Sequence, residues 1–307
     1  MRRLADLDSC DVSDKESLAV YRKNILVLQE MLNGEDMHSL LGQFLRIRFK
    51  FTLFKTFFES ISLTIPEYST DAGYENSIVS LLRESFFEAH IMAVRRLIDD
   101  HDYNPKRSVY SVLSFLRVIE DNIEYFTREN YVCYNGLPYS GGDHSFGSLS
   151  DLTESANLQF DFLCGKTKRD RKDKLQKSVI GGLAKKIERL SKVRYYANKY
   201  YAHASNPLNR DPAPERNQIS LLEMEEHLKT IESVLLGCGK LVASYVPTEL
   251  SFYPGNLIEN WERPAISPDN IIPVLNYWDN ERKETRDSAE KLRAVDYLNW
   301  ESEKPNI

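Results

Sequence analysis

Apolar residues recur at steps of three and four over five long stretches of the chain, which is the spacing of one face of an α-helix. Strict alternation of apolar and polar residues, the pattern of a half-buried strand, is scarce. The pattern therefore predicts a series of amphipathic helices. Their apolar sets are Leu18, Tyr21, Ile25, Leu28 and Leu32; Leu40, Phe44, Ile47, Phe51, Phe54, Phe58 and Ile61; Ile78, Leu82, Phe86, Ala89, Ala93 and Leu97; Val109, Val112, Leu116, Ile119, Ile123 and Phe126; and Leu221, Met224, Leu228, Ile231, Leu235, Cys238, Val242 and Tyr245.

Helix-ending residues separate these stretches. Asn33-Gly34 follows the first, Pro66 follows the second, and Asn104-Pro105 divides the third from the fourth. The segment 131–142, YVCYNGLPYSGG, is expected to be a loop, with a small hairpin around Asn135-Gly136 as the alternative. Because each apolar stripe must be buried against another, the sequence predicts an all-α, up-and-down helical bundle.

The chain divides into three parts by its apolar pattern and proline content. Residues 1–13 are expected to be a flexible N-terminus, and residues 14–246 form the helical bundle. Residues 247–307 form a Pro-rich extension that ends in a short charged helix, within DNERKETRDSAEKLRAVDYL. This extension has too few apolar residues for a core of its own, so we expect it to wrap the bundle or to meet a partner.

Composition narrows the class of protein. The chain has 307 residues, of which 42% are hydrophobic and 28% charged, as in soluble globular proteins. No apolar run reaches the roughly 18 residues of a membrane span, and the N-terminus lacks the apolar core of a signal peptide. The four cysteines show no paired spacing, so a cytoplasmic protein with reduced thiols is expected. No phosphate-binding Gly-rich loop is present, and DDHD at 99–102 favours a solvated turn over a metal site, so neither cofactor nor metal is expected.

Charge is unevenly distributed along the chain. The net charge is −6, yet residues 166–199 hold thirteen Lys or Arg against three Asp or Glu, which leaves a strongly acidic remainder. Such asymmetry is typical of a surface that faces a polyanion, and a solvated helix face is the alternative interpretation. The candidate RNA contacts in this segment are Lys168, Arg169, Arg171 and Lys172.

The segment 178–203 predicts one further helix. Its apolar seam begins at Ile180, Leu183, Ile187 and Leu190 and, continued, meets Arg194, Ala197 and Tyr201. An arginine on such a seam must be paired or open into a polar pocket. Beside the seam, Tyr196, Lys199 and His203 share a face. Tyr196 and Arg194 join the candidate RNA contacts, although tyrosines on a bundle helix more often serve packing.

The end of this segment resembles a known signature. ANKYYAH, at 197–203, is similar to the motif of the HEPN superfamily (higher eukaryotes and prokaryotes nucleotide-binding domain), and its form is that of abortive-infection members. A second stretch, AHIMAVRRLIDDHDYNPKRSVYSVLSFLRVI at 89–119, resembles their R-L-x-D helix and the start of the next helix. The resemblance covers about residues 40–245 and places the chain among phage-defence or toxin–antitoxin proteins.

The resemblance implies a catalytic set. In the superfamily's nucleases RNA is cut without metal, His203 transfers protons, and Asn198 helps to orient the phosphate. The family arginine falls on Ala197, which has no charge. Lys199 and Arg96 are equal candidates for the replacement cation, and Arg194 ranks third because its side chain leans away from His203. The resemblance also implies a homodimer, with RNA or a nucleotide, and an antitoxin or another defence protein, as partners.

Other interpretations remain open. His203 alternatively caps the end of its helix, and Arg96 with Asp99 alternatively only ties helices together. His90 is expected to be a hydrogen-bonded histidine of the core or of an interface. A catalytically degenerate HEPN module that binds RNA, a nucleotide or a protein without cleavage is the main alternative to the nuclease. A protein scaffold whose C-terminal extension makes the contacts is the third.

Overall fold

The computed structural model describes residues 6–7, 10–34, 38–64, 77–99, 110–139, 149–166, 168–202, 219–242 and 271–294. Within these ranges the chain is helical and no strand occurs. The helices are α1 (Lys15–Asn33), α2 (Leu40–Thr64), α3 (Ser77–Ile98), α4 (Val112–Glu120), η3 (Ile123–Tyr125), α5 (Arg128–Val132), η4 (Cys133–Asn135), α6 (Leu149–Cys164), α7 (Lys177–Glu188), α8 (Ser191–Tyr196), η5 (Ala197–Ala202), α9 (Leu221–Leu241) and α10 (Ile271–Ala294).

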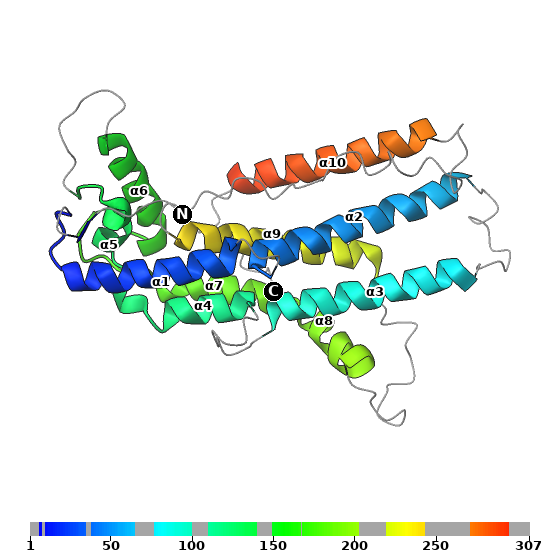
Figure 1. Cartoon of the computed structure of the whole chain (residues 1–307), viewed down its shortest axis with the longest axis horizontal. Coiled ribbons are helices and arrows are strands. Elements are labelled where there is room, and N and C mark those ends of the chain that lie inside the picture. Colours follow the sequence, from blue (N-terminus) through cyan, green and yellow to red (C-terminus); the bar gives the residue numbers. More distant parts are fainter. Residues whose placement is uncertain are drawn as a thin grey trace, which may run out of the picture.

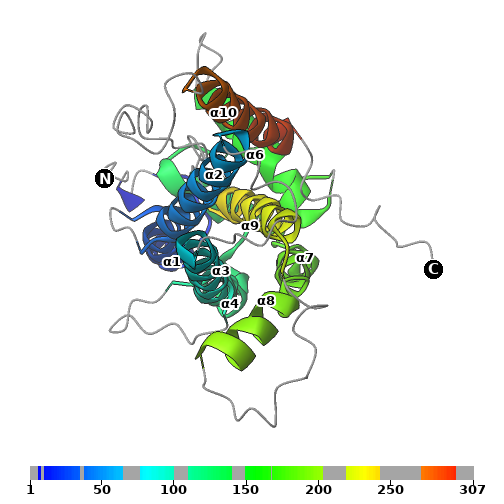
Figure 2. The ribbon, with the colours of Figure 1, turned by 90° about the vertical axis from the view of Figure 1, so that its right-hand side faces the viewer.

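The helices form an elongated bundle. In Figure 1, α1 and α4 lie side by side in one half, and α2 and α3 lie side by side in the other. Figure 2 looks down this arrangement and shows α9 among the other helices, with α10 outside α2. The predicted all-α bundle is confirmed. No described helix combines the length and the hydropathy that a membrane span requires.

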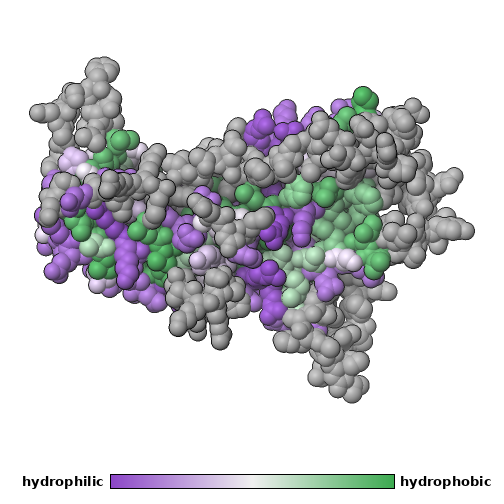
Figure 3. All heavy atoms as spheres, in the orientation of Figure 1, coloured by the Kyte–Doolittle hydropathy of each residue, from purple (hydrophilic) through white to green (hydrophobic). Residues whose placement is uncertain are grey.

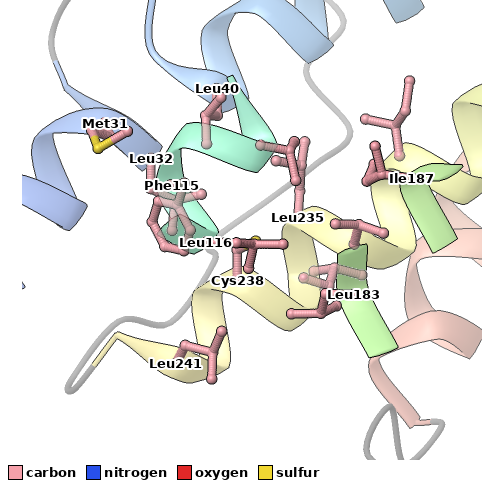
Figure 4. Packing of buried hydrophobic residues seen from close by; sticks show 14 of the residues in the cluster. Met31, Leu32, Leu40, Phe115, Leu116, Leu183, Ile187, Leu235, Cys238 and Leu241 are labelled. Carbon is pink, nitrogen blue, oxygen red and sulfur yellow. The ribbon is translucent and has the colours of Figure 1, made fainter. Parts of the chain in front are cut away.

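The core is continuous from α1 to α9. Figure 4 shows side chains from α1, α4, α7 and α9 meeting in its centre. Leu183 and Ile187 of α7 and Leu235 of α9 are each no more than 1% exposed. The apolar stripes that predicted separate helices are therefore the surfaces that hold these helices together.

Local capping explains where several helices begin. The Asp14 carboxylate accepts a hydrogen bond from the Ser17 backbone N–H at 2.9 Å at the start of α1. Ser111 and Ser220 each form a capping box, at the start of α4 and α9. A cap of this kind stabilises a helix by about 1 kcal/mol. At the other end of α1, Gly34 follows the last residue, as its position in the sequence predicts.

Two boundaries differ from the sequence prediction. The stripe Val109–Phe126 predicts one helix, but α4 ends at Glu120, where Asn122 donates its side-chain N–H to the Val118 carbonyl. A 3-10 turn and the short α5 follow, and Thr127 caps α5. The Asn135-Gly136 pair forms a left-handed turn after η4, with Gly136 at φ 81°, and no hairpin forms within residues 131–139.

α6 is the helix that the apolar pattern does not reveal. Its inward residues include Phe160, Leu163 and Cys164, each at most 1% exposed, but Leu158 and Phe162 on its outer side are 50% and 53% exposed. Apolar residues on both sides blur the helical period. The helix stops at Gly165, whose φ of +62° is the left-handed conformation common after a helix end.

α10 is longer than the short charged helix predicted for the C-terminal extension. It begins at Ile271 and packs on α2. Trp278 is 2% exposed, and Lys55 of α2 donates to the Glu281 carboxylate at 2.7 Å. The extension thus contributes one amphipathic helix to the outside of the bundle.

Candidate functional site

The predicted helix 178–203 is divided into three segments. After α7 the backbone makes a turn in which the Leu190 N–H donates to the Ile187 carbonyl at 3.0 Å, and the Val193 N–H donates to the Leu190 carbonyl at 3.0 Å. These three residues are all at most 2% exposed. Residues spaced three apart drift around an α-helix, which has about 3.6 residues per turn. In a turn of three residues such side chains stay on one side, so all three remain buried. The prediction of one continuous helix is therefore wrong.

α8 continues directly into a π-helix. This segment, η5, spans Ala197–Ala202 and contains the stretch ANKYYA. Its backbone bonds run from residue i to i+5, so the α-helical spacing that groups Tyr196 and Lys199 with His203 does not hold through it. Short π-helical segments inside helices are frequent at functional sites.

Arg194 ties this segment to the end of α3. Its Nη2 donates to the Ile98 carbonyl at 2.6 Å, and its Nε lies 3.7 Å from the Asp99 carboxylate. Asp99 also accepts a hydrogen bond from Arg95 Nε at 3.1 Å. Of the two alternatives expected for Arg194, a partner or a polar pocket, the structure shows a partner. The guanidinium is thereby used to cap α3.

Lys199 and Asn198 lie on the π-helical segment. Lys199 donates to the Tyr195 hydroxyl at 2.6 Å, and its ammonium sits 4.9 Å from the centre of the Tyr195 ring. Asn198 is exposed. Arg96 is exposed on the last turn of α3, the helix against which η5 packs. η5 therefore packs on the helix that carries Arg96, and Arg194, in α8 just before η5, contacts the end of that helix.

His203 lies outside the described residues, so its geometry relative to Asn198, Lys199 and Arg96 stays a prediction. Tyr196 is 8% exposed, and its neighbour Tyr195 is 45% exposed. Tyr195 is thus the tyrosine of this pair that presents its ring to solvent. The sequence does not tell which of the two tyrosines is exposed, because a departure from α geometry changes which of two neighbouring side chains faces the core.

The two arginines of the basic segment 166–177 are held by carboxylates. Arg169 donates to Glu154 at 2.6 Å and to Asp161 at 2.8 Å. The hydrogen bonds from Arg169 raise the pKa of its guanidinium, that to Glu154 most. Arg171 donates to Glu129 at 2.6 Å. Lys168 and Lys172, by contrast, are exposed. RNA contact through these four residues stays a prediction, with the lysines the more accessible.

A buried arginine fixes this basic segment in place. Arg128 is fully buried and donates to Asp173 at 3.1 Å, to Asp161 at 2.6 Å and to the Cys164 sulfur at 3.1 Å. Burial alone raises the pKa of Asp173, but hydrogen bonds from Lys166, from the Asp170 backbone and from Arg128 outweigh it and lower the pKa. The network was missed because its carboxylates lie far from Arg128 in the sequence.

Among the described residues there is a cavity but no metal-binding cluster. Within the described ranges, no group of three or more His, Cys, Asp or Glu is placed to hold a metal ion. Asp99 is the only described residue of the DDHD segment. A cavity of about 380 Å³ lies between α2, α9 and α10, away from the η5 segment. Its lining mixes charges of both signs, among them Arg48, Lys229 and Glu284.

The described chain is an all-α bundle with the ANKYYA segment packed on α3. The chain belongs to the AbiU2 family of HEPN proteins, whose family model matches residues 33–263. This match confirms the predicted membership in an abortive-infection branch of the superfamily, and the family is one of phage defence. α10 lies beyond the matched residues. No curated protein and no solved structure matches the chain.

Proposed function

We propose that the chain is an RNA-directed HEPN protein and acts as a metal-independent endoribonuclease in phage defence or a toxin–antitoxin pair. The observation that carries the proposal is the position of Asn198 and Lys199. They lie on a π-helical segment that ends one residue before His203 in the sequence and packs on α3, the helix that carries Arg96. Asn198 and Lys199 thus precede a titratable imidazole by five and four positions in the sequence.

The chemistry needs three functions. Attack of a 2′-hydroxyl on the adjacent phosphate requires a proton acceptor, a proton donor to the leaving oxygen, and a charge that stabilises the phosphorane. An imidazole titrates near neutrality and serves the proton transfers, so His203 takes that role. Asn198 orients the phosphate.

The positive charge must come from a residue other than 197. Ala197 is fully buried in the core, and Arg194 is bound to α3. Lys199 and Arg96 are the remaining candidates, and both belong to elements that meet in this region.

The test is cleavage of a fluorescently labelled single-stranded RNA by the full chain in the presence of EDTA. His203→Ala is expected to reduce the rate by about 10²-fold to 10⁴-fold, as loss of a general acid or base does. Lys199→Ala and Arg96→Ala, compared separately, identify the cation. Lys185→Ala, on an exposed position of α7, is the matched control and is expected to cleave as the wild type does.

A degenerate module that binds RNA without cutting it is the second candidate function. The burial of Ala197 and the use of Arg194 as a cap favour it, because both remove a guanidinium from the phosphate. Absence of cleavage by the wild type, together with salt-dependent RNA binding that weakens in Lys168→Ala/Lys172→Ala, selects this candidate. An antitoxin or another defence protein would be a further partner in either case.

A further inference from the structure

The cavity between α2, α9 and α10 is a second candidate site, away from the η5 segment. Its volume of about 380 Å³ is within the range of sites for small organic molecules. In Figures 1 and 2, α10 lies along the outside of α2, and its residues form one wall of the cavity. Because α10 lies beyond the residues that the family model matches, this wall is not part of the matched domain.

The inner wall of the cavity is largely apolar. Phe51 of α2 and Leu228 of α9 line it, and both are buried. Thr52, also buried, adds a hydroxyl group. Figure 3 shows hydrophobic side chains gathered in the half of the molecule where Figure 1 places α2 and α3, and hydrophilic ones along the edge where α10 lies. A ligand in the cavity therefore meets aromatic and aliphatic carbon on its inner side.

The positive charges that line the cavity are already paired. Arg48 donates to the Glu232 carboxylate at 2.6 Å, and the Glu232 side chain is fully buried. The Lys229 ammonium lies 3.3 Å from the Glu225 carboxylate and 3.0 Å from the Glu226 carboxylate. An anion entering the cavity would have to displace a carboxylate from one of these two cations, so the cavity is not built for an anion.

The outer wall carries carboxylates on one side of α10. Glu281, Glu284 and Asp287 line the cavity and follow each other at steps of three, the spacing of neighbours on a helix surface. Glu281 accepts a hydrogen bond from Lys55 at 2.7 Å. The ion pairs of the described α10 residues involve Glu281 and Asp279, and neither Glu284 nor Asp287 takes part in one. Glu284 is exposed and Asp287 is half-buried, so a ligand reaches both from solvent.

The lining as a whole is negative. Two cations stand against four carboxylates, which leaves a formal charge of −2: Arg48 and Lys229 against Glu225, Glu281, Glu284 and Asp287. The outer partners Lys55 and Glu232 add one charge of each sign and leave this balance unchanged. A carboxylate that is shielded from water is stable only with a positive partner. The charge that this cavity lacks is therefore that of a dication.

We propose that the cavity binds a small linear diamine, with its two ammonium groups at Glu284 and Asp287 and its methylene chain against Phe51 and Leu228. Side chains three positions apart on a helix have Cβ atoms about 5–6 Å apart, which is similar to the separation of two nitrogens joined by four methylene groups. Hydrogen bonds from an ammonium to a carboxylate are charge-assisted and strong. The apolar chain of the diamine fills the space in front of the inner wall.

Hydroxyl groups on both walls suit the same ligand. Thr285 of α10 lines the cavity and donates its hydroxyl hydrogen to the Glu281 carbonyl at 2.8 Å. Its oxygen is thereby turned into an acceptor, and an ammonium offers only donors. Ser288, one turn after Glu284 on the same helix, supplies a further hydroxyl.

Other cations fit the cavity less well. Ca²⁺ takes six to eight oxygen ligands and Mg²⁺ requires octahedral geometry. Within the described ranges, no group of three or more side chains is placed to hold a metal ion. An inner wall that contains Phe51 and Leu228 offers a hydrated ion nothing, whereas it buries the methylene groups of a diamine. A monoamine reaches only one of the two carboxylates.

Binding of a diamine would connect α10 to the bundle. The ligand contacts carboxylates of α10 and apolar residues of α2 and α9, so its full set of contacts exists only while α10 is docked. A ligand that binds one state of a protein stabilises that state. The diamine should therefore hold α10 on α2. This inference goes beyond the proposed function and does not depend on it.

The first test is isothermal titration calorimetry of the full chain with putrescine, a diamine with four methylene groups, at constant ionic strength. We expect a dissociation constant of about 0.1 mM, and binding of butylamine that is about tenfold weaker or less. Glu284→Gln and Asp287→Asn should each weaken putrescine binding about tenfold, because each removes one charge-assisted hydrogen bond. Asp279→Asn is the matched control on α10, because Asp279 is 70% exposed and does not line the cavity; it should bind as the wild type does.

Hydrogen exchange of the full chain is the second test. Saturating putrescine should slow exchange in 271–294 several-fold in the wild type and in Asp279→Asn, but not in the double variant Glu284→Gln/Asp287→Asn. Exchange in α1, which does not line the cavity, should stay the same. Without putrescine the double variant should exchange as the wild type does, because its two carboxylates form no ion pair; this comparison shows that the variant is folded.

Three results would each overturn the proposal. They are the absence of binding heat with the wild type at about 5 mM putrescine, binding of butylamine or CaCl₂ as tight as that of putrescine, and unchanged affinity in both carboxylate variants. None of these measurements involves RNA, so failure here leaves the His203 test of the proposed function intact.

Discussion

His90 is a buried histidine without a polar environment. It is 4% exposed, its ring lies 5.9 Å from the Phe51 ring and 5.8 Å from the Phe86 ring, and within the described residues neither ring nitrogen has a hydrogen-bond partner. Burial lowers its pKa to about 3, and proximity to His227 contributes in the same direction. Its expected place in the core is confirmed, but a polar partner for it is not found among these residues.

This histidine should make the fold acid-sensitive. The unfolded chain takes up the proton near pH 6.5, and the folded chain takes it up only near pH 3. Stability due to His90 is therefore complete above pH 6.5 and falls as the pH decreases toward 3, on the order of 2 kcal/mol between pH 7 and 5. His90→Leu should flatten this slope in urea unfolding measured at both pH values. His38→Gln, at an exposed position, should keep it, and an unchanged slope in His90→Leu would contradict the assignment.

Single residues also show which contacts can be predicted from the sequence and which cannot. The pairing of Arg194 was predictable, because an arginine on an apolar seam must find a partner. That the partner is the end of α3 was not, since the contact joins residues 96 positions apart. Likewise, the basic composition of 166–177 is visible in the sequence, but the carboxylates that hold Arg169 and Arg171 are supplied by α5 and α6.

At the scale of helices, regular apolar spacing was a sound guide. α1, α2 and α9 follow from it, because each buries its predicted stripe against its neighbours. α3 is a helix as predicted, but its predicted stripe is wrong in part: Leu82 and Ala89 are exposed, whereas His90, Val94 and Leu97 are buried. The pattern failed where a helix is apolar on both sides, as in α6, and where the backbone leaves α geometry, as between α7 and η5. Of the candidate site, the sequence identified the α8–η5 segment and the end of α3 as elements, but not how their side chains are paired.

The close contact between α7 and α9 requires a glycine at position 237, where a larger residue would meet Leu183. A Cβ built at Gly237 of α9 would lie 2.6 Å from Cδ2 of Leu183, which is buried, whereas a Cβ at Gly181 of α7 meets nothing within 4 Å. Gly237→Ala should lower the free energy of unfolding, and Gly181→Ala should raise it by about 0.5–1 kcal/mol through helix propensity. We expect the two variants to differ by about 1–3 kcal/mol in chemical denaturation. Equal changes in the free energy of unfolding for the two variants would mean that α7 and α9 can move apart at little cost in free energy.

At the scale of the whole molecule, α10 is an addition to the bundle. It lies outside the residues that the family model matches, and it packs on α2. Among its described residues Trp278 and Thr285 are buried, and Glu281 pairs with Lys55 of α2. The continuous core from α1 to α9 contains none of its residues. We therefore expect α10 to open without unfolding the rest.

Hydrogen exchange with mass spectrometry checks this expectation. Trp278→Ala should speed exchange in 271–294 about a hundredfold, which corresponds to the roughly 3 kcal/mol lost when a buried tryptophan is truncated. Exchange in α9 should not change. Asp279→Ala is the control, because the Asp279 side chain is 70% exposed. Equal acceleration in α9 and α10 would show one cooperative unit instead.

The burial of Ala197 also limits which side chains can stand at position 197. Position 197, where the resemblance to the superfamily's motif leads us to expect arginine, lies in the buried apolar cluster. Ala197→Arg would place a charge in a dry interior, at a cost of several kcal/mol. An arginine at position 197 would therefore fit only after its neighbours had been replaced as well.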